Sequence, residues 1–598
     1  MFSFPIFARA SIGLGLAAIA GCASLHPKAD DTRAPQSFYT VTGEIALARH
    51  QPRVAALQYA AAAANDGDVT LIERATQVTA ETLQPTLSEK VAARWSQVDP
   101  KSVEAQRAAA RAALALQKID QAADHYRLVL VSSPIGTEAE FTALEAELGS
   151  NDNIFGSRQL ADRLAVSFPG SAAALQLQGF TALRADDPAA AVRSFTAALG
   201  FADGAHAGDP GARRELLQTL ARAQIMAGDV DGPLAQSQKT LEREDTAQNR
   251  LDYALLLMTA QHDSAATQQL ELLTKNPEYA PVALRLLGLV EFQQGHFDAA
   301  STRFAQLLRA DKFLDDAFYY LGVIADRHDD PEQALRLYAQ VQSGENAVPA
   351  LLRASALLEK HGAPAAADEL LDRLVEDEPL RAPEILASRA RIYADLGDSP
   401  RAIAVLTAAI ADYPDSVDLR YAMASTYEDM GRVPAALHEL TYLVNLRPDD
   451  PAALNALGYT LADHSKDLNR ARKLIERAYA AAPKNSAILD SFGWVLFRRG
   501  HVAEAEPYLR AAYQDDRGGD IAAHLGEVLW QLGRPADAEQ IWSEAAAVDR
   551  DNRLLKSTRQ RFHGAAQPPS APPMAPEPPA PAPVPSPLHP PQPSSTVY

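Results

Sequence analysis

The sequence predicts an all-α protein whose helix pairs stack into a solenoid, and two observations support this fold class. Alanine and leucine dominate the composition, threonine, valine and aromatic residues are sparse, and only 31 of the 598 residues are glycine, which favours helix over sheet. Pairs of small residues twelve positions apart also recur along the chain. A single core usually holds about 100–200 residues, whereas a repeat array extends its core with length.

The small-residue pair is clearest in "FGWVLFRRGHVAEAEP", where Gly493 and Ala505 stand twelve residues apart. The first member of the pair recurs at Ala254, Gly288, Gly322, Ser355, Ala390, Ala424, Gly458, Gly493 and Gly526, in steps of 33 to 35 residues. This period resembles that of the tetratricopeptide repeat, a unit of two antiparallel helices about 34 residues long. The resemblance implies a right-handed superhelical solenoid with a concave inner surface.

Large residues and turn residues hold fixed places in each repeat. Four positions past the second small residue come Phe304, Tyr338, Leu406, Leu440, Leu509 and Trp542. Seven positions past the first small residue come Gly295, Gly362, Gly397, Gly431, Gly500 and Gly533. We expect the small residues to let the two helices approach closely, and each glycine to supply the positive φ that ends the first helix. Between Gly458 and Ala471 the spacing is thirteen, so one residue is inserted there.

The repeat pattern divides the chain into segments. Residues 37–250 predict degenerate repeats, residues 251–550 a well-defined array, and residues 551–564 a C-terminal helical cap. The segment "FADGAHAGDPGA" at 201–212 predicts a turn-rich loop. Residues 565–598 contain fourteen prolines, which predicts a disordered, extended tail. Such a tail serves either as a spacer or as a ligand for a proline-binding groove or a carboxylate pocket.

The N-terminus has the layout of a bacterial lipoprotein signal. An apolar run from Ala10 to Ala20 follows Arg9 and is shorter than the roughly 20 residues that span a bilayer. The tetrapeptide that ends in Cys22, "IAGC", resembles the lipobox. That resemblance implies a signal peptide at 1–21, acylation of Cys22, and a flexible tether at 22–36. With alanine directly after Cys22, it further implies the outer membrane, facing the periplasm. A secreted protein with an unmodified Cys22 is the alternative.

Charge and motifs argue against several function classes. The formal net charge is -20, and an acidic surface repels phosphate backbones, so nucleic-acid binding is not expected. The sequence shows no metalloprotease helix motif, no nucleophile elbow and no phosphate-binding loop. We therefore expect no catalytic residues, no metal and no cofactor, and we interpret the chain as a protein-binding surface.

The concave surface would be formed by the inward positions of each first helix. These positions hold Arg285, Phe292, Tyr319, Arg391, Tyr421, Glu428, Asn455, Tyr459, Asp490, Trp494, Phe497, Arg498 and Trp530. Inward aromatic residues are typical anchors of protein interfaces. The alternative is that some of them pack against the helix of the next repeat.

One block carries a more specific resemblance. Residues 453–500 include "GYTLAD" from Gly458 and "ILDSFGW" from Ile488, and they resemble the signature block of a group of Gram-negative outer-membrane repeat lipoproteins. That group includes the lipoprotein partner of the periplasmic carboxyl-terminal processing protease. The resemblance implies an adaptor that holds this protease and its peptidoglycan-hydrolase substrates together at the membrane. The alternative is a structural scaffold for envelope assembly or polysaccharide export. Self-association is left open.

Overall fold

The computed structural model describes residues 36–64, 67–205, 210–548, 550 and 552–563. These residues form 31 α-helices and one short 3-10 helix, and none of them lies in a strand. The predicted all-α class is therefore confirmed for this part of the chain. The signal peptide at 1–21, Cys22, the tether up to residue 35 and the tail at 565–598 lie outside the described residues.

The helices follow one another with short connections. The first sixteen are α1 (Gln36–Ala48), α2 (Pro52–Ala63), α3 (Val69–Glu81), α4 (Pro85–Val98), α5 (Val103–Ala115), α6 (Ile119–Ser132), α7 (Thr137–Gly149), α8 (Ile154–Ser167), α9 (Ala172–Arg184), α10 (Pro188–Ala205), α11 (Pro210–Met226), α12 (Asp231–Arg243), α13 (Ala247–Thr259), α14 (Asp263–Leu273), α15 (Ala280–Gln293) and α16 (Phe297–Arg309). The remainder are α17 (Leu314–Arg327), α18 (Pro331–Tyr338), α19 (Ala347–Lys360), α20 (Pro364–Asp377), the 3-10 helix η1 (Pro379–Arg381), α21 (Ala382–Asp395), α22 (Ser399–Asp412), α23 (Val417–Asp429), α24 (Val433–Leu446), α25 (Pro451–Asp463), α26 (Leu468–Ala481), α27 (Ser486–Arg498), α28 (Val502–Asp515), α29 (Gly519–Gln531), α30 (Pro535–Val548) and α31 (Arg553–His563).

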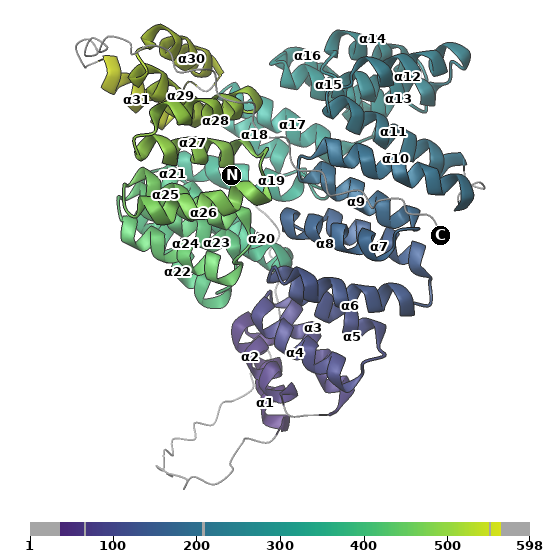
Figure 1. Cartoon of the computed structure of the whole chain (residues 1–598), viewed down its shortest axis with the longest axis vertical. Coiled ribbons are helices and arrows are strands. Elements are labelled where there is room, and N and C mark those ends of the chain that lie inside the picture. The colour runs from purple at the N-terminus through teal and green to yellow at the C-terminus, as the bar shows by residue number, and fades with distance from the viewer. Residues whose placement is uncertain (1–35, 65–66, 206–209, 549, 551, 564–598) are drawn as a thin grey trace, which may run out of the picture.

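Helix pairs stack into one continuous coil, shown in Figure 1. Each odd-numbered helix from α9 to α29 packs against the even-numbered helix that follows it. From α17 onward most odd-numbered helices also contact the next odd-numbered one, as α17 and α19, α19 and α21, α21 and α23, α25 and α27, α27 and α29, and α29 and α31 do. One face of the coil is therefore built from odd-numbered helices, as expected for tetratricopeptide repeats. The solenoid prediction is confirmed.

Small residues make room for large ones within each pair. A Cβ added at Gly526 would lie 1.9 Å from Trp542 Nε1, and one added at Gly493 would lie 2.6 Å from Leu509 Cγ. The predicted close approach is confirmed, and the structure shows what fills the space. The large side chain sixteen positions later packs directly over the glycine. At Gly458 the partner is Ile475, seventeen positions later, which matches the inserted residue.

The turn between the two helices of a pair has positive φ. All six predicted turn glycines have φ between 69° and 88°. The same register position also has positive φ where glycine is absent, at His50, Gln117, Asp186, Gln261, Asp329 and Ser465. A side chain in this conformation costs about 1–2 kcal/mol. The stacking of the helices therefore imposes the turn, and glycine only lowers its cost.

The predicted loop at 201–212 is wrong over most of its length. Helix α10 continues to Ala205, and α11 begins at Pro210. Proline is well tolerated in the first turn of a helix, where its missing N–H has no partner to lose. Pro210 therefore begins a helix here rather than breaking one.

The coil closes on itself after one turn. Two side chains of the first repeats reach the C-terminal end of α22, because Arg53 Nη1 donates to the carbonyl of Ala411 at 3.1 Å and Gln84 Nε2 donates to that of Asp412 at 2.7 Å. From the opposite side, Arg447 Nε donates to the carbonyl of Ala115 at 3.1 Å. Phe155 also packs against the core of the C-terminal repeats. Repeats more than 300 residues apart in sequence are thus held side by side.

Candidate protein-binding surface

Two pockets lie between successive odd-numbered helices. The first, here called the acidic pocket, has a volume of about 480 Å³ and lies between α21 and α23. Its charged lining consists of Glu384, Arg391, Asp395, Asp418 and Asp429. Four carboxylates and one guanidinium line the pocket, and Arg381 and Arg553 outside the lining pair with Glu384 at 2.8 Å and with Asp429 at 3.7 Å, so the pocket keeps a small negative charge.

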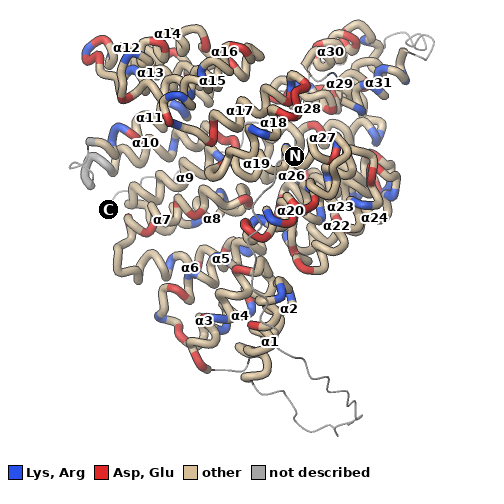
Figure 2. Tube along the Cα trace, turned by 180° about the vertical axis from the view of Figure 1, so that it is seen from behind, with Lys and Arg blue, Asp and Glu red and all other residues tan. Residues whose placement is uncertain are grey.

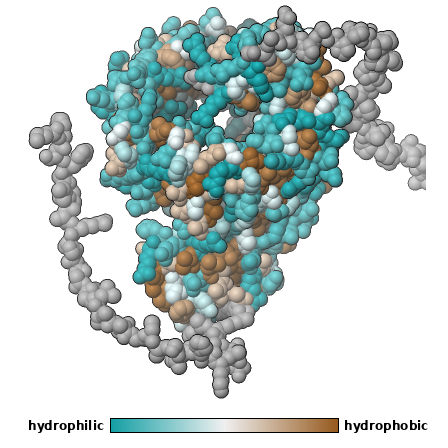
Figure 3. Space-filling view, turned by 90° about the vertical axis from the view of Figure 1, so that its left-hand side faces the viewer, coloured by the Kyte–Doolittle hydropathy of each residue, from teal (hydrophilic) through white to brown (hydrophobic). Residues whose placement is uncertain are grey.

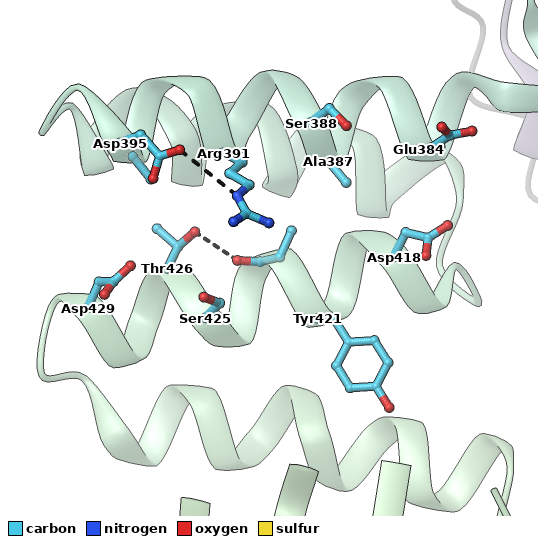
Figure 4. A pocket seen from close by; sticks show the side chains of 12 residues that line it. Glu384, Ala387, Ser388, Arg391, Asp395, Asp418, Tyr421, Ser425, Thr426 and Asp429 are labelled. Atoms are coloured by element: carbon cyan, nitrogen blue, oxygen red, sulfur yellow. Dashed lines mark hydrogen bonds and ion pairs between the residues drawn. The ribbon is translucent and has the colours of Figure 1, made fainter. Parts of the chain in front are cut away.

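Figure 4 shows how these side chains are arranged. Arg391 from α21 pairs with Asp395 at 3.9 Å at one end of the acidic pocket, and Glu384 and Asp418 lie at the other end. Burial raises the pKa of Asp418, and the nearby carboxylates of Asp152 and Glu384 raise it further. Arg381 pairs with Glu384 at 2.8 Å and the charge of Arg447 lowers the pKa of Asp418, so the negative charge at this end of the pocket is partly balanced.

The second pocket, here called the aromatic pocket, has a volume of about 440 Å³. It lies where α25, α27, α29 and α31 meet, and its lining includes Asp463, Trp494, Phe497, Arg498, His524, Glu527, Gln531 and Arg561. The Trp494 ring stacks on the His524 ring with centroids 4.0 Å apart and on the Phe497 ring with centroids 5.1 Å apart. Trp494 Nε1 donates to Asp463 Oδ1 at 3.1 Å, which fixes the orientation of the indole.

A buried ion pair lies behind the aromatic pocket. His524 Nδ1 is 2.9 Å from Asp490 Oδ2, and Tyr459 Oη is 3.5 Å from His524 Nε2. Burial lowers the pKa of His524, but the ion pair with Asp490 and the charges of Asp463 and Asp520 outweigh burial and raise it above its ordinary value. The imidazole therefore favours its charged form at the base of the pocket.

The predicted surface residues divide into groups. Arg391 and Tyr421 line the acidic pocket, and Trp494, Phe497 and Arg498 line the aromatic pocket. Asp490 and Tyr459 contact His524 behind the aromatic pocket. Glu428 and Asn455 are half-buried on α23 and α25. Arg285, Phe292, Tyr319 and Trp530 lie in neither pocket.

Several of the predicted aromatic anchors have packing partners. Trp494 and Phe497 are only 5% and 9% exposed. Phe292 packs on Tyr320 of α17, with centroids 5.2 Å apart, and Trp530 packs on Phe562 of α31 at 5.3 Å. Tyr319 contacts the ring of Tyr338, and Arg285 forms an ion pair with Asp316 of α17. Phe292, Trp530 and Arg285 therefore contact the next repeat, the Tyr338 partner of Tyr319 lies in the same repeat, and only part of each Trp494 and Phe497 ring faces the aromatic pocket.

Sequence reasoning missed His524 and most of the acidic pocket. His524 stands 34 positions after Asp490, but Gly493 and Gly526 are 33 apart, so His524 falls one place later in its repeat than Asp490 does. A comparison of equivalent repeat positions therefore does not pair them. The four carboxylates of the acidic pocket occupy two repeat positions, since Asp418 stands 34 residues after Glu384 and Asp429 stands 34 residues after Asp395, so a comparison of successive repeats could have found them.

Other site types find little support in the described ranges. No group of three or more His, Cys, Asp or Glu residues there could hold a metal ion. None of the described helices is long and apolar enough to cross a membrane. Acidic and basic residues are interspersed along the coil, as Figure 2 shows, so no single basic stripe follows it.

Comparison with protein-family models identifies the repeats. Tetratricopeptide-repeat models match residues 285–347 and 351–417, and again 393–458 and 496–561. Together with the paired helices, these matches identify tetratricopeptide repeats within residues 285–561. No finer family follows from them.

Three curated proteins are similar over part of their length. A TPR repeat-containing protein of Pseudomonas aeruginosa is 32% identical over 255 residues, which cover 43% of each chain. The human aspartyl/asparaginyl beta-hydroxylase is 26% identical over 226 residues, 34% of this chain and 29% of that enzyme. Bacteriophage adsorption protein A of Escherichia coli is 29% identical over 100 residues, 17% of this chain and 10% of that protein. The chain thus spans less than half the length of each of these relatives.

Solved structures resemble the chain only loosely. The yeast Tom70 structure covers 88% of this chain and 94% of its own at 12% identity, with a TM-score of 0.32. The Cut9–Hcn1 structure covers 88% and 96% at 13% identity, with a TM-score of 0.29. At these scores the likeness carries no argument about curvature or partners.

Proposed function

We propose that this chain is a non-catalytic scaffold that binds protein partners along the face formed by its odd-numbered helices. The observation that carries the proposal is the pair of pockets between successive odd-numbered helices. Tetratricopeptide repeats present such inner surfaces to other proteins, and the repeat assignment supports the same role. The negative charge of the acidic pocket suits a basic segment of the partner.

The proposal extends to location and partner. The lipobox-like residues before Cys22 support an acyl anchor in the outer membrane, with the repeats facing the periplasm. The resemblance of residues 453–500 to outer-membrane repeat lipoproteins supports a periplasmic carboxyl-terminal processing protease and peptidoglycan hydrolases as partners. In that role the coil would raise the local concentration of protease and substrate.

Site-specific photo-crosslinking tests the binding face. A photoreactive phenylalanine replaces Ser425 in the acidic pocket or Gln531 in the aromatic pocket, in the full-length chain in its own envelope. Both side chains are exposed, so substitution spares the core. The matched controls are Thr407 on α22 and Gln540 on α30, which are exposed on even-numbered helices.

We expect partner crosslinks at Ser425 and Gln531 and background at Thr407 and Gln540. Recovery of a processing protease or of peptidoglycan hydrolases supports the adaptor role. Recovery of glycan-synthesis or export proteins instead replaces it with the envelope scaffold. Equal crosslinking at all four positions refutes the odd-numbered helix face as the binding surface.

A further inference from the structure

The first helix pair exposes an apolar face. Phe38, Val41 and Ile45 lie at helical spacing on α1 and are 45–57% exposed, while Gly43 and Ala46 are buried on the opposite side of that helix. On α2, Val54 and Leu57 are 44% and 45% exposed. Figure 3 shows hydrophobic surface at this lower end of the molecule, where Figure 1 places α1 to α4. We call these five side chains the N-terminal apolar face.

This face lies at the end of the stack. Helix α1 packs on α2, and no described helix precedes it. The other end of the coil is closed differently, because α31 covers α29 with its buried Leu555 and Thr558 and turns Lys556 and Gln560 outward. End repeats of a solenoid normally need such a polar outer side for solubility. The N-terminal end lacks one, so a partner surface is required.

The neighbouring sequence indicates what that surface is. Cys22 stands fourteen positions before Gln36, and a chain of this length spans at most about 50 Å. Among residues 23–35 only Leu25 is a large apolar residue, so this segment offers little apolar surface to five exposed hydrophobic side chains. An acyl anchor at Cys22 would therefore hold the apolar face close to a bilayer.

The chemistry of the face also suits a lipid surface. Arg49 and His50 are exposed at the turn between α1 and α2. Aromatic and aliphatic residues beside basic ones are typical of helices that rest at the headgroup boundary, with the apolar side buried about 5–10 Å. A patch of this kind covers on the order of a few hundred Å². A stable dimer buries about 800 Å² on each partner, so a second copy is the weaker fit.

We propose that the N-terminal apolar face rests in the headgroup–acyl boundary of the bilayer that anchors Cys22. The inference depends on the acyl anchor of the proposed function and adds an orientation to it. With α1 and α2 at the membrane, the coil stands on its first repeat.

Spin labelling tests this docking. The only natural cysteine is Cys22, so the full-length acylated chain can carry a single label at Val41→Cys, or at Val166→Cys as the matched control. Val166 is an exposed valine on α8, away from the face. The protein is placed in vesicles of phosphatidylethanolamine and phosphatidylglycerol. Collision rates of each label with oxygen, which enters lipid, and with a water-soluble nickel complex are then measured.

We expect the label at position 41 to lose most of its collisions with nickel while keeping those with oxygen, and the label at 166 to keep both. If the label at position 41 loses its collisions with both oxygen and nickel, protein covers the face and the proposal is overturned. If the label keeps its collisions with both, the face lies in open water and the proposal is likewise overturned. The intact mass of the same sample reports acylation separately. An unmodified Cys22 overturns the anchor and the docking together, whereas an acylated chain with a water-exposed position 41 overturns the docking alone.

Discussion

The C-terminal repeats and the middle repeats share one backbone geometry but differ in how continuous their apolar core is. From Ala424 to Leu555 the buried hydrophobic residues form a single cluster, which includes Phe492, Trp494 and Trp542. Between α13 and α22 the core is divided into separate smaller clusters. The repeat pattern therefore specifies how two helices pair, and the size of the residues between pairs decides how firmly the pairs are joined.

Ion pairs also connect successive helix pairs in the middle repeats. Arg303 of α16 pairs with Glu291 at 3.1 Å and also reaches Glu271 of the previous pair. Arg401 of α22 pairs with Glu359 of α19 at 3.0 Å and with Asp368 of α20 at 2.6 Å. Partly buried charge pairs are weakened by salt and by the loss of either partner, whereas apolar contacts are not. We therefore expect the two regions to respond to different perturbations.

The largest effect is expected for Gly526→Val in the C-terminal cluster. Any Cβ there meets Trp542 Nε1 at 1.9 Å, so α29 and α30 must move apart. Because the cluster is continuous, we expect a loss of about 3 kcal/mol or more in unfolding free energy, spread over α23 to α31. Urea unfolding followed by tryptophan fluorescence measures it. In the control Gly170→Val the new Cβ meets no atom within 4 Å, and an equal loss there would contradict the argument.

A smaller, local effect is expected for Arg303→Met in the middle repeats. This change leaves Glu291 without its cation in a partly buried position, at a cost of about 1–3 kcal/mol. Hydrogen exchange should increase in α13 to α16 and stay unchanged in α27 to α30. The control is Arg336→Met, whose ion pair with Glu332 is exposed on both sides. We expect this change to lower the unfolding free energy by less than about 1 kcal/mol. An equal increase in hydrogen exchange in both regions would contradict the difference between the middle and the C-terminal repeats.

The C-terminal cluster should show its own pH dependence. The folded-state pKa of His524 is raised, so its ion pair with Asp490 contributes stability that is complete below the unfolded pKa of about 6.5. That contribution is lost as pH rises through the folded pKa. Unfolding free energy of the C-terminal repeats should fall over this window in the wild-type chain. Asp490→Asn should flatten the slope, and an unchanged slope would mean that another group titrates there.

The smallest effect on stability is expected at the closure between distant repeats. The triple change Arg53→Ala, Gln84→Ala and Arg447→Ala removes three hydrogen bonds, each worth about 1 kcal/mol or less. Helix content should stay the same while the radius of gyration from small-angle scattering increases. Arg49→Ala, at the same turn as Arg53, is the control. A radius that does not change would show that apolar contacts such as that of Phe155 hold the closure alone.

Local repeat geometry was predictable from the sequence because it depends on neighbours at fixed spacing. The pairs Gly493 with Leu509 and Gly526 with Trp542 follow from the period of the small and large residues. The turns at Gln117 and Ser465 did not follow, because their positive φ comes from stacking and not from the residue itself.

Contacts between different repeats could not be predicted from the sequence. The burial of Trp494 depends on His524 in the next repeat. The contact of Arg53 with α22 depends on a curvature that accumulates over many pairs, and no single spacing in the sequence records it. The division into degenerate and regular arrays, the anchor and the binding residues stay predictions.

The bonds from Arg53, Gln84 and Arg447 all end on main-chain carbonyls. Every residue carries a main-chain carbonyl, so side-chain substitutions at the accepting positions of α22 and α5 leave these three hydrogen bonds intact. Helix α22 and the end of α5 can therefore vary in sequence without opening the contact between the distant repeats. The residues on the binding face can therefore change while the closed shape of the coil is kept.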